Sequence, residues 1–176
     1  MKTVSVRGLG AMHTNVSYDG ISITNAQNGQ IDLSKFGTEN IESLSLSNGN
    51  PILRLQTAKS LASANTLNIE TTKPFFADST RTNGFANIAA GSFGMFNPTL
   101  NLNHQFNEKL SASLFADILS SKGDYPYLLR YGSSPTDSSS NERRENNDFF
   151  SARLEANLFY NINEKSNIKA KAYFYH

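Results

Sequence analysis

The chain has 176 residues, and its 16 basic and 15 acidic side chains leave a net charge of +1, so it lacks the concentrated positive charge that phosphate-directed nucleic-acid binding requires. Cysteine is absent, which excludes disulfides, thiolate nucleophiles and cysteine-based zinc sites. No run of eighteen apolar residues is present, so no membrane-spanning helix is expected. The 21 Asn, 22 Ser and 12 Thr favour strands with one polar face, turns and polar loops over helical bundles.

The start of the sequence is strand-like from Met1 onward. It shows neither the charged segment nor the following apolar segment of a signal peptide. We therefore expect either a cytoplasmic protein or a sequence that lacks its true N-terminus.

Short β-like segments dominate residues 1–73, beginning with residues 4–6 before Arg7 and Gly8. The Asp-Gly pair at 19–20 separates two alternating segments and predicts a type I′ hairpin, because both central residues of that turn need a positive φ. Further predicted elements are an apolar alternation at 31–33, a brief turn or helical start at 38–40, a strand at 41–46, about two helical turns at 58–64 and a strand at 67–70.

Residues 74–176 contain longer alternating segments. Apolar and polar side chains alternate at 100–106, 110–118, 150–160 and 168–174, and a weaker fifth segment covers 83–93. The longest of these reach 11 residues, whereas strands of globular proteins average about 5–6. Roughly ten tilted residues cross an outer membrane, so the length favours transmembrane strands.

The connections between these segments differ in length. Near-identical tight turns are predicted at 107–109 and 163–165, and a long polar stretch covers 122–147. Short turns at one end and long loops at the other are typical of outer-membrane barrels, with aromatic girdles at the strand ends. The aromatic residues in question are Phe106, Phe149, Phe150, Phe159 and Tyr160. A soluble antiparallel β-sandwich also has alternating strands and is the alternative.

No catalytic or metal-binding pattern is evident in the sequence. Gly8 and Gly10 do not complete a dinucleotide fingerprint, because His13 stands at the third glycine position and no helical pattern follows. His13, His104 and His176 lack the spacing of metal ligands. We therefore predict that the protein is not an enzyme and has no catalytic residues, no metal and no cofactor.

Two carboxylates lie on the polar side of the predicted strands. Asp117 and Glu155 are placed where Arg153 or Lys169 would pair with them. A catalytic carboxylate pair is one interpretation. A wet, charged barrel lumen explains the same residues more simply, and we prefer it.

Four motifs follow one another in residues 4–49: VSVRG at 4–8, VSYDGI at 16–21, GQIDLSKF at 29–36 and NIESLSLSNG at 40–49. In this order and spacing they resemble the plug domain of TonB-dependent outer-membrane receptors, and LNIETTK at 67–73 resembles its last strand. The resemblance implies a mainly β protein. Residues 1–73 would be the C-terminal, small mixed part of the plug domain, and residues 74–176 the first about five antiparallel strands of an incomplete transmembrane β-barrel. Residues 50–64 depart from the family, since many members have a glycine-rich stretch there.

The family pattern also implies missing parts. Members have a signal peptide, a TonB-contacting box and the first half of the plug, followed by a barrel of about 22 strands. Five strands cannot close, since membrane barrels need about eight or more, and hydrocarbon does not tolerate an unpaired sheet edge. We therefore expect a non-functional fragment that aggregates or is degraded in isolation.

For the intact protein, the resemblance implies a transporter of the cell outer membrane of a Gram-negative bacterium. It would import a scarce or large nutrient of the siderophore, cobalamin or glycan class, with energy delivered through TonB and its inner-membrane energising complex. Outer-membrane lipid and the extracellular nutrient are implied partners, a surface lipoprotein is a further candidate, and nucleic acid is not expected. The alternative function is that of a soluble Asn/Ser-rich β-sandwich binding glycans or cell surfaces.

The resemblance implies plug roles for six residues: Arg7, Gly8, Asp19, Gly20, Glu42 and Gly49. In similar plugs, the motifs with the arginine and the glutamate hold charged contacts with the barrel wall. The glycines would allow tight turns, and the aspartate would shape the hairpin. The alternative is that these are ordinary surface charges and turn residues.

The candidate ligand-binding residues lie at the base of the long polar stretch. They are Tyr125, Tyr127, Arg130 and Tyr131. Aromatic and arginine side chains dominate recognition surfaces, which makes this group the best candidate for contact with cargo. An aromatic girdle at the outer membrane interface is the alternative interpretation.

Overall fold

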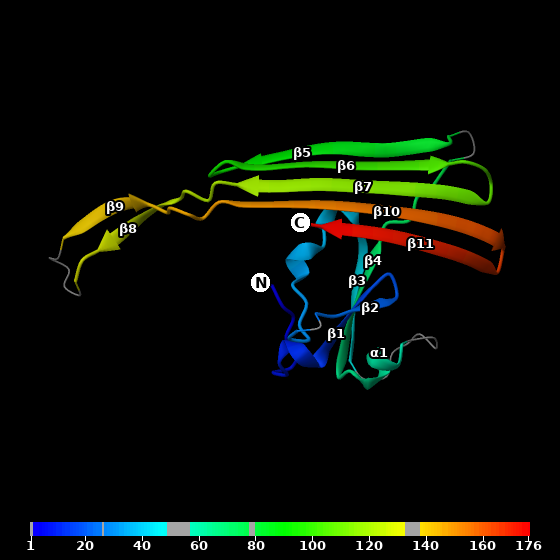
Figure 1. Ribbon diagram of the computed structural model, residues 1–176, viewed down its shortest axis with the longest axis horizontal. Coiled ribbons are helices and arrows are strands. Elements are labelled where there is room, and N and C mark those ends of the chain that lie inside the picture. Colours follow the sequence, from blue (N-terminus) through cyan, green and yellow to red (C-terminus); the bar gives the residue numbers. More distant parts are fainter. Residues whose placement is uncertain (1, 26, 49–56, 78–79, 133–137) are drawn as a thin grey trace. The chain divides into compact units, whose positions relative to one another are not determined.

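The structure is a computed structural model that describes residues 2–25, 27–48, 57–77, 80–132 and 138–176. It divides into two compact units, Met1–Phe75 and Phe76–His176. The fold is mainly β, with a small mixed sheet in the first unit and an antiparallel sheet in the second (Figure 1).

The first unit is built on a four-stranded sheet with the order β2-β1-β4-β3. The strands are β1 (Thr14–Tyr18), β2 (Ile21–Ile23), β3 (Ile41–Asn48) and β4 (Asn65–Thr71). β1 pairs with β4 in parallel, and the other two pairings are antiparallel. The short helical segments are η1 (Ala11–His13), η2 (Leu33–Lys35), η3 (Thr38–Asn40) and α1 (Ala58–Ala62). These bounds confirm the elements predicted at 38–40, 41–46, 58–64 and 67–70, with shifted ends.

A small apolar core lies on one face of this sheet. Val16 and Tyr18 alternate on β1 and pack with Phe36 and Ile69, all four buried. The rings of Tyr18 and Phe36 stack with centroids 4.7 Å apart. Such aromatic pairs contribute about 0.5–1.5 kcal/mol beyond the burial of their surface, so this contact fixes the loop before β3 onto the sheet.

The predicted hairpin between β1 and β2 is confirmed. Asp19 and Gly20 both have a positive φ, of 48° and 85°, as a type I′ turn requires. β1 and β2 pair antiparallel on either side, with Tyr18 opposite Ile21. The Asp-Gly pair therefore sets the register of this edge of the sheet.

The strand expected at residues 4–6 is wrong. Only Val6 pairs there, in an isolated bridge with Leu9, whose backbone N–H donates to the Val6 carbonyl at 3.0 Å. Arg7 and Gly8 both have a positive φ, of 53° and 77°. Two consecutive left-handed residues reverse the chain at once, so no strand extends past this point.

The apolar alternation at 31–33 does not form a strand. The helical turn η2 begins at Leu33 instead. Asp32 caps this turn: its Oδ1 accepts hydrogen bonds from the backbone N–H and hydroxyl of Ser34, at 3.0 and 2.7 Å. The same oxygen accepts from the backbone N–H of Lys2 at 2.9 Å. The bond from Lys2, helped by those from Ser34 and opposed by partial desolvation, lowers the pKa of Asp32 to about 2.

This lowered pKa predicts a pH-dependent contribution of Asp32. Ionised Asp32 stabilises the turn fully above its unfolded-state pKa of about 4, and this contribution is lost as the pH falls toward about 2. Asp32→Asn should therefore speed hydrogen exchange of the Ser34 amide near neutral pH, and the difference from wild type should shrink near about pH 2. An equal difference at both pH values would contradict this role of the charge.

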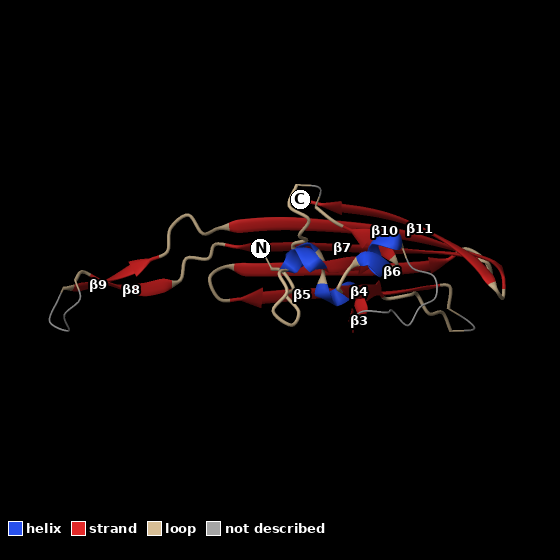
Figure 2. Cartoon of the chain, turned by 90° about the horizontal axis from the view of Figure 1, so that it is seen from below, coloured by secondary structure: helices blue, strands red, loops and turns tan. Residues whose placement is uncertain are grey.

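The second unit contains a five-stranded antiparallel sheet with the order β11-β10-β7-β6-β5 (Figures 1 and 2). The strands are β5 (Thr82–Gly91), β6 (Met95–Gln105), β7 (Leu110–Ser121), β10 (Phe149–Asn163) and β11 (Ser166–Tyr175). They confirm the five alternating segments. Within the described residues, the outer strands β5 and β11 do not pair with each other, so the sheet is open.

Two tight turns at one end of this sheet are confirmed. Asn107 Oδ1 accepts hydrogen bonds from the backbone N–H groups of Lys109 and Leu110, both at 2.9 Å. Asn163 Oδ1 accepts from the backbone N–H of Lys165 at 3.0 Å. In both turns the asparagine side chain takes the place of a backbone acceptor, which explains why the two sequences are so similar.

The opposite end of the sheet differs from the expectation in two ways. β5 and β6 are joined there by a tight turn, in which Phe93 and Gly94 have φ values of 59° and 68°. The prediction of long loops at this end is therefore wrong for that connection. The long polar stretch at 122–147 also contains a hairpin of β8 (Pro126–Arg130) and β9 (Ser139–Arg143), which projects beyond the ends of β7 and β10 (Figures 1 and 2).

Candidate functional site

The five-stranded sheet has one polar and one apolar face, because its side chains alternate in register across all five strands. The polar face is buried: its central side chains are 2–9% exposed, at Thr99, Asn101, Ser113, Asp117, Ser151, Glu155 and Asn157. The apolar face is open, with 37–46% exposure at Leu100, Leu102, Leu114, Ile118, Leu154 and Leu158. This is the reverse of a soluble sheet, whose apolar face packs on a core.

A buried ion pair joins β7 and β10 on the polar face. Asp117 and Arg153 lie directly opposite each other in the antiparallel register. Arg153 Nε donates to Asp117 Oδ1 at 2.6 Å, and Arg153 Nη2 donates to Asp117 Oδ2. Their side chains are only 3% and 10% exposed, so both charges are compensated by this two-bond contact.

A second buried ion pair joins β10 and β11. Lys171 Nζ donates to Glu155 Oε1 at 2.6 Å, with side-chain exposures of 9% and 2%. Asn157 Nδ2 donates to the same Oε1 and to Ser113 Oγ, both at 3.1 Å. A continuous polar network therefore crosses three strands at the level of Asn157.

The expectation that these carboxylates pair with Arg153 or Lys169 is confirmed for Arg153, which pairs with Asp117. Glu155 pairs with Lys171, which the sequence did not suggest. Lys169 lies on the same face, with its Nζ 5.2 Å from the centroid of the Phe159 ring. The register decides this outcome, because Lys171 lies opposite Asn157, one step from Glu155, whereas Lys169 lies opposite Phe159.

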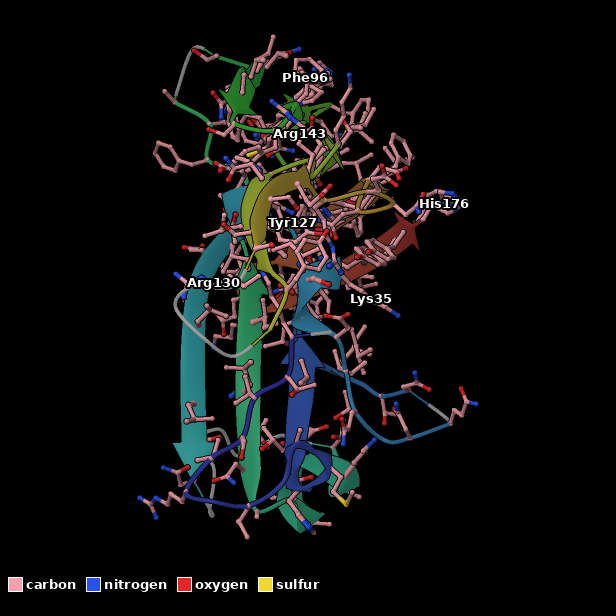
Figure 3. The ribbon with its side chains drawn as sticks, turned by 90° about the vertical axis from the view of Figure 1, so that its left-hand side faces the viewer. Lys35, Phe96, Tyr127, Arg130, Arg143 and His176 are labelled. Atoms are coloured by element: carbon pink, nitrogen blue, oxygen red, sulfur yellow. The ribbon has the colours of Figure 1, made fainter. Side chains whose placement is uncertain are left out.

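The hairpin β8–β9 carries most of the predicted ligand-binding residues, and Tyr127, Arg130 and Arg143 are labelled on it in Figure 3. In its register Tyr127 lies opposite Glu142, and Arg130 lies opposite Ser139. Tyr131 lies just beyond β8, and its hydroxyl is 3.3 Å from Ser140 Oγ.

The hairpin separates the predicted ligand-binding residues. Tyr127 and Tyr131 share one face by the two-residue period, whereas Arg130 points to the other face. Tyr125 precedes β8 and packs edge-on against Phe93, with ring centroids 6.1 Å apart. Two of the four residues therefore lie on one face, as exposed rings with Leu129 between them.

The base of the hairpin is held by contacts that the sequence did not suggest. Gly123 has a φ of 60°, and a β-carbon there would lie 2.4 Å from the carbonyl oxygen of Asn147. The Asn147 side chain donates to the Gly123 carbonyl at 3.2 Å. Arg143 Nη1 donates to Asp124 Oδ2 at 3.0 Å in an exposed ion pair.

Among the predicted plug residues, Asp19 has the most contacts. Its Oδ1 and Oδ2 accept from the backbone N–H and hydroxyl of Thr71, at 2.9 and 2.7 Å. Gly8 and Gly20 occupy left-handed turn positions, and Arg7 and Glu42 are exposed. Gly49 lies outside the described residues. Thr71, only 1% exposed, was missed because nothing in its local sequence indicates a partner 52 residues away.

No helix in the described part of the chain has the length and apolar character needed to cross a membrane. No group of three or more His, Asp or Glu side chains gathers in a metal-binding arrangement in the described ranges.

Comparisons with known proteins place the first unit in a family. Residues 1–68 match the family model of the TonB-dependent receptor plug domain. No curated protein matches the sequence. The solved structure of the pyoverdine outer membrane receptor FpvA from Pseudomonas aeruginosa PAO1, bound to pyoverdine, matches with a TM-score of 0.60 and 13% identity. The match covers 92% of this chain and 20% of that receptor, so the chain spans about a fifth of the length of this structural relative.

These matches agree with the fold described above. At 13% identity the structural match concerns the fold alone, which is a small mixed sheet followed by antiparallel strands. TonB-dependent receptors are outer-membrane transport proteins of Gram-negative bacteria and not enzymes, which agrees with the prediction that no enzyme is present. The soluble sandwich, the alternative left by the sequence, has no support from either match. The match over residues 1–68 thus agrees with the resemblance of the first unit to the plug domain of TonB-dependent receptors.

Proposed function

We propose that the protein containing this chain is an importer of the outer membrane, energised through TonB. The observation that carries this proposal is the reversed sheet of the second unit, with buried polar and open apolar side chains, directly after a plug domain. An apolar outer face and a polar inner face are what a strand in an outer-membrane barrel requires. In this proposal residues 1–73 form the C-terminal part of the plug, and residues 74–176 form the first barrel strands.

The cargo that we propose first is a ferric siderophore. The structural match is to a receptor solved with the siderophore pyoverdine, and cobalamin and glycans are the other cargo classes to be tested. Since the outer membrane holds no ATP, the work of import would come from TonB and its inner-membrane complex. The exposed face of Tyr127 and Tyr131 would contribute to cargo contact, because rigid aromatic side chains supply large contact areas at low entropic cost.

The test uses the full-length receptor that contains this sequence, expressed in cells lacking other siderophore receptors. We expect the protein in the outer-membrane fraction, and we expect uptake of radioactive ferric siderophore that stops in a TonB-deficient strain. A water-soluble protein would overturn the whole proposal. A membrane protein that takes up labelled cobalamin or glycan instead would overturn the cargo class only.

Substitutions in the hairpin test the candidate cargo contact. Tyr127→Ala and Tyr131→Ala should each weaken siderophore binding by about tenfold, as expected for an aromatic contact worth about 1.4 kcal/mol. Leu128→Ala, on the opposite face of β8, is the matched control and should leave the dissociation constant within about twofold. Binding is measured on outer membranes by titration with labelled siderophore. Equal effects of Tyr127→Ala and Leu128→Ala would remove the tyrosine face from the site.

A further inference from the structure

Two hollows lined by described residues lie on the apolar face of the five-stranded sheet, one after the other along the strands. The first, of about 650 Å³, lies toward the tight turns at 107–109 and 163–165. The second, of about 540 Å³, lies toward the end that carries the hairpin. Both volumes are in the range of small-molecule sites, which is about 300–1,000 Å³.

The first hollow results from small side chains between large ones. Two neighbouring sets of residues border the hollow, and the strand register aligns each set across the sheet. Each set contains both alanines and leucines. Leu114 and Leu158 stand at its sides. The alanines that line it are Ala112, Ala156, Ala170 and Ala172.

The first hollow ends in a polar pair on the apolar face of the sheet. Thr82 on β5 and His104 on β6 line it and lie opposite each other in the register. Thr82 Oγ1 and His104 Nδ1 are 2.7 Å apart, and the His104 ring contacts Phe106 edge-on, with centroids 4.8 Å apart. Within the described residues His104 Nε2 makes no hydrogen bond, so it is open to a ligand.

The dimensions fit an acyl chain with a polar head. The hollow crosses from alanines on β11 to the polar pair on β5 and β6, over four strand-to-strand steps of about 4.8 Å each, or about 19 Å. One leaflet of a bilayer contributes about 15 Å of hydrocarbon, so a tilted acyl chain spans a similar length. A histidine beside an aromatic ring at a strand end is suited to the boundary between hydrocarbon and headgroups.

We propose that this hollow is a phospholipid site, in which one acyl chain lies over Ala156, Ala170 and Ala172 and the headgroup phosphate accepts a hydrogen bond from His104 Nε2–H, while the Thr82 hydroxyl donates to His104 Nδ1 and orients the ring. The inference rests on the proposed function, because it requires the apolar face to meet lipid. The proposal assigns one fixed phospholipid position on the apolar face, in addition to the general contact of that face with membrane hydrocarbon. The other hollow is also lined by Asp117 and Arg153, but their side chains belong to the polar face of the sheet, whereas those of Thr82 and His104 lie on the apolar face.

The experiment uses the full-length receptor in vesicles of phosphatidylethanolamine and phosphatidylglycerol. After detergent extraction, native mass spectrometry counts the phospholipids retained per protein. We expect one retained phospholipid in wild type, and at least a tenfold loss in Ala156→Phe, whose ring fills the first hollow. Ala116→Phe is the matched control, because Ala116 lines the second hollow on the same face and its substitution should leave retention unchanged.

A further variant tests the headgroup contact. His104→Leu should lower retention of phosphatidylethanolamine at least fivefold and leave retention of diacylglycerol, which has no phosphate, unchanged. Equal retention of phosphatidylethanolamine by wild type and Ala156→Phe would overturn the lipid site while leaving the importer intact. A protein that does not enter the vesicles at all would overturn the proposed function, and the lipid site with it.

Discussion

Asp117→Ala is expected to lower the free energy of unfolding of the full-length protein by about 3–5 kcal/mol. The substitution removes the carboxylate that accepts two hydrogen bonds from the Arg153 guanidinium, in a pair whose side chains are only 3% and 10% exposed. The desolvation cost of a buried charge that loses this acceptor, and not the attraction within the pair, determines this magnitude. The measurement is denaturant unfolding in detergent micelles, followed by far-ultraviolet circular dichroism.

Two comparisons make this prediction specific. The double variant Asp117→Leu with Arg153→Met removes both charges and should recover most of the loss, because a buried pair replaced by apolar side chains is often near neutral. Asp124→Ala breaks the exposed pair with Arg143, whose side chains are 41% and 71% exposed, and should cost no more than about 1 kcal/mol. If Asp117→Ala and Asp124→Ala cost the same, water reaches the polar face and the pair is not a buried one.

The sequence was sufficient to predict the features that depend on neighbours in the chain. Alternation at 110–118 and 150–160 identified β7 and β10, since a two-residue period is a local property of a strand. The Asp-Gly pair at 19–20 identified the hairpin, since only a few residue types tolerate a positive φ. The asparagine turns at 107–109 and 163–165 were found for the same reason.

Features that depend on register could not be predicted. Lys169 and Lys171 are two residues apart and lie on the same face, so their sequence positions give no preference for Glu155. The pairing of β10 with β11 makes the choice. The hairpin β8–β9 was missed for another reason: β8 is exposed along its length and apolar residues do not alternate with polar ones in it, while β9 is polar.

The contact between Asp19 and Thr71 was hidden by sequence distance. It depends on the parallel pairing of β1 with β4, which brings together residues 52 apart. A parallel pair needs a long connection, and no local pattern specifies which strand returns beside β1. The segments VSYDGI at 16–21 and LNIETTK at 67–73 were each recognised from the sequence, but the contact between them was visible only in the fold.

Asp19→Ala is expected to destabilise the first unit by about 2–4 kcal/mol. The substitution removes two hydrogen bonds to a carboxylate, at 2.9 and 2.7 Å, and leaves the buried N–H and hydroxyl of Thr71 without these acceptors. It also places alanine at a φ of 48°, which costs about 1–2 kcal/mol for a residue that is not glycine, asparagine or aspartate. Asp19 thus closes the hairpin and ties it to the end of β4.

Hydrogen exchange of the β4 amides of Leu67 and Ile69 in the full-length receptor measures this effect, and a loss of about 2–4 kcal/mol corresponds to a rate increase of about 30-fold or more. Asp19→Asn is the matched control, because asparagine tolerates the left-handed conformation and its Oδ1 still accepts from the Thr71 N–H. It should show less than half the destabilisation of Asp19→Ala. Thr71→Val, which removes only the hydroxyl, should fall between wild type and Asp19→Ala. If Asp19→Ala exchanges at the wild-type rate, the hairpin holds β4 through backbone pairing alone and the carboxylate has no structural role.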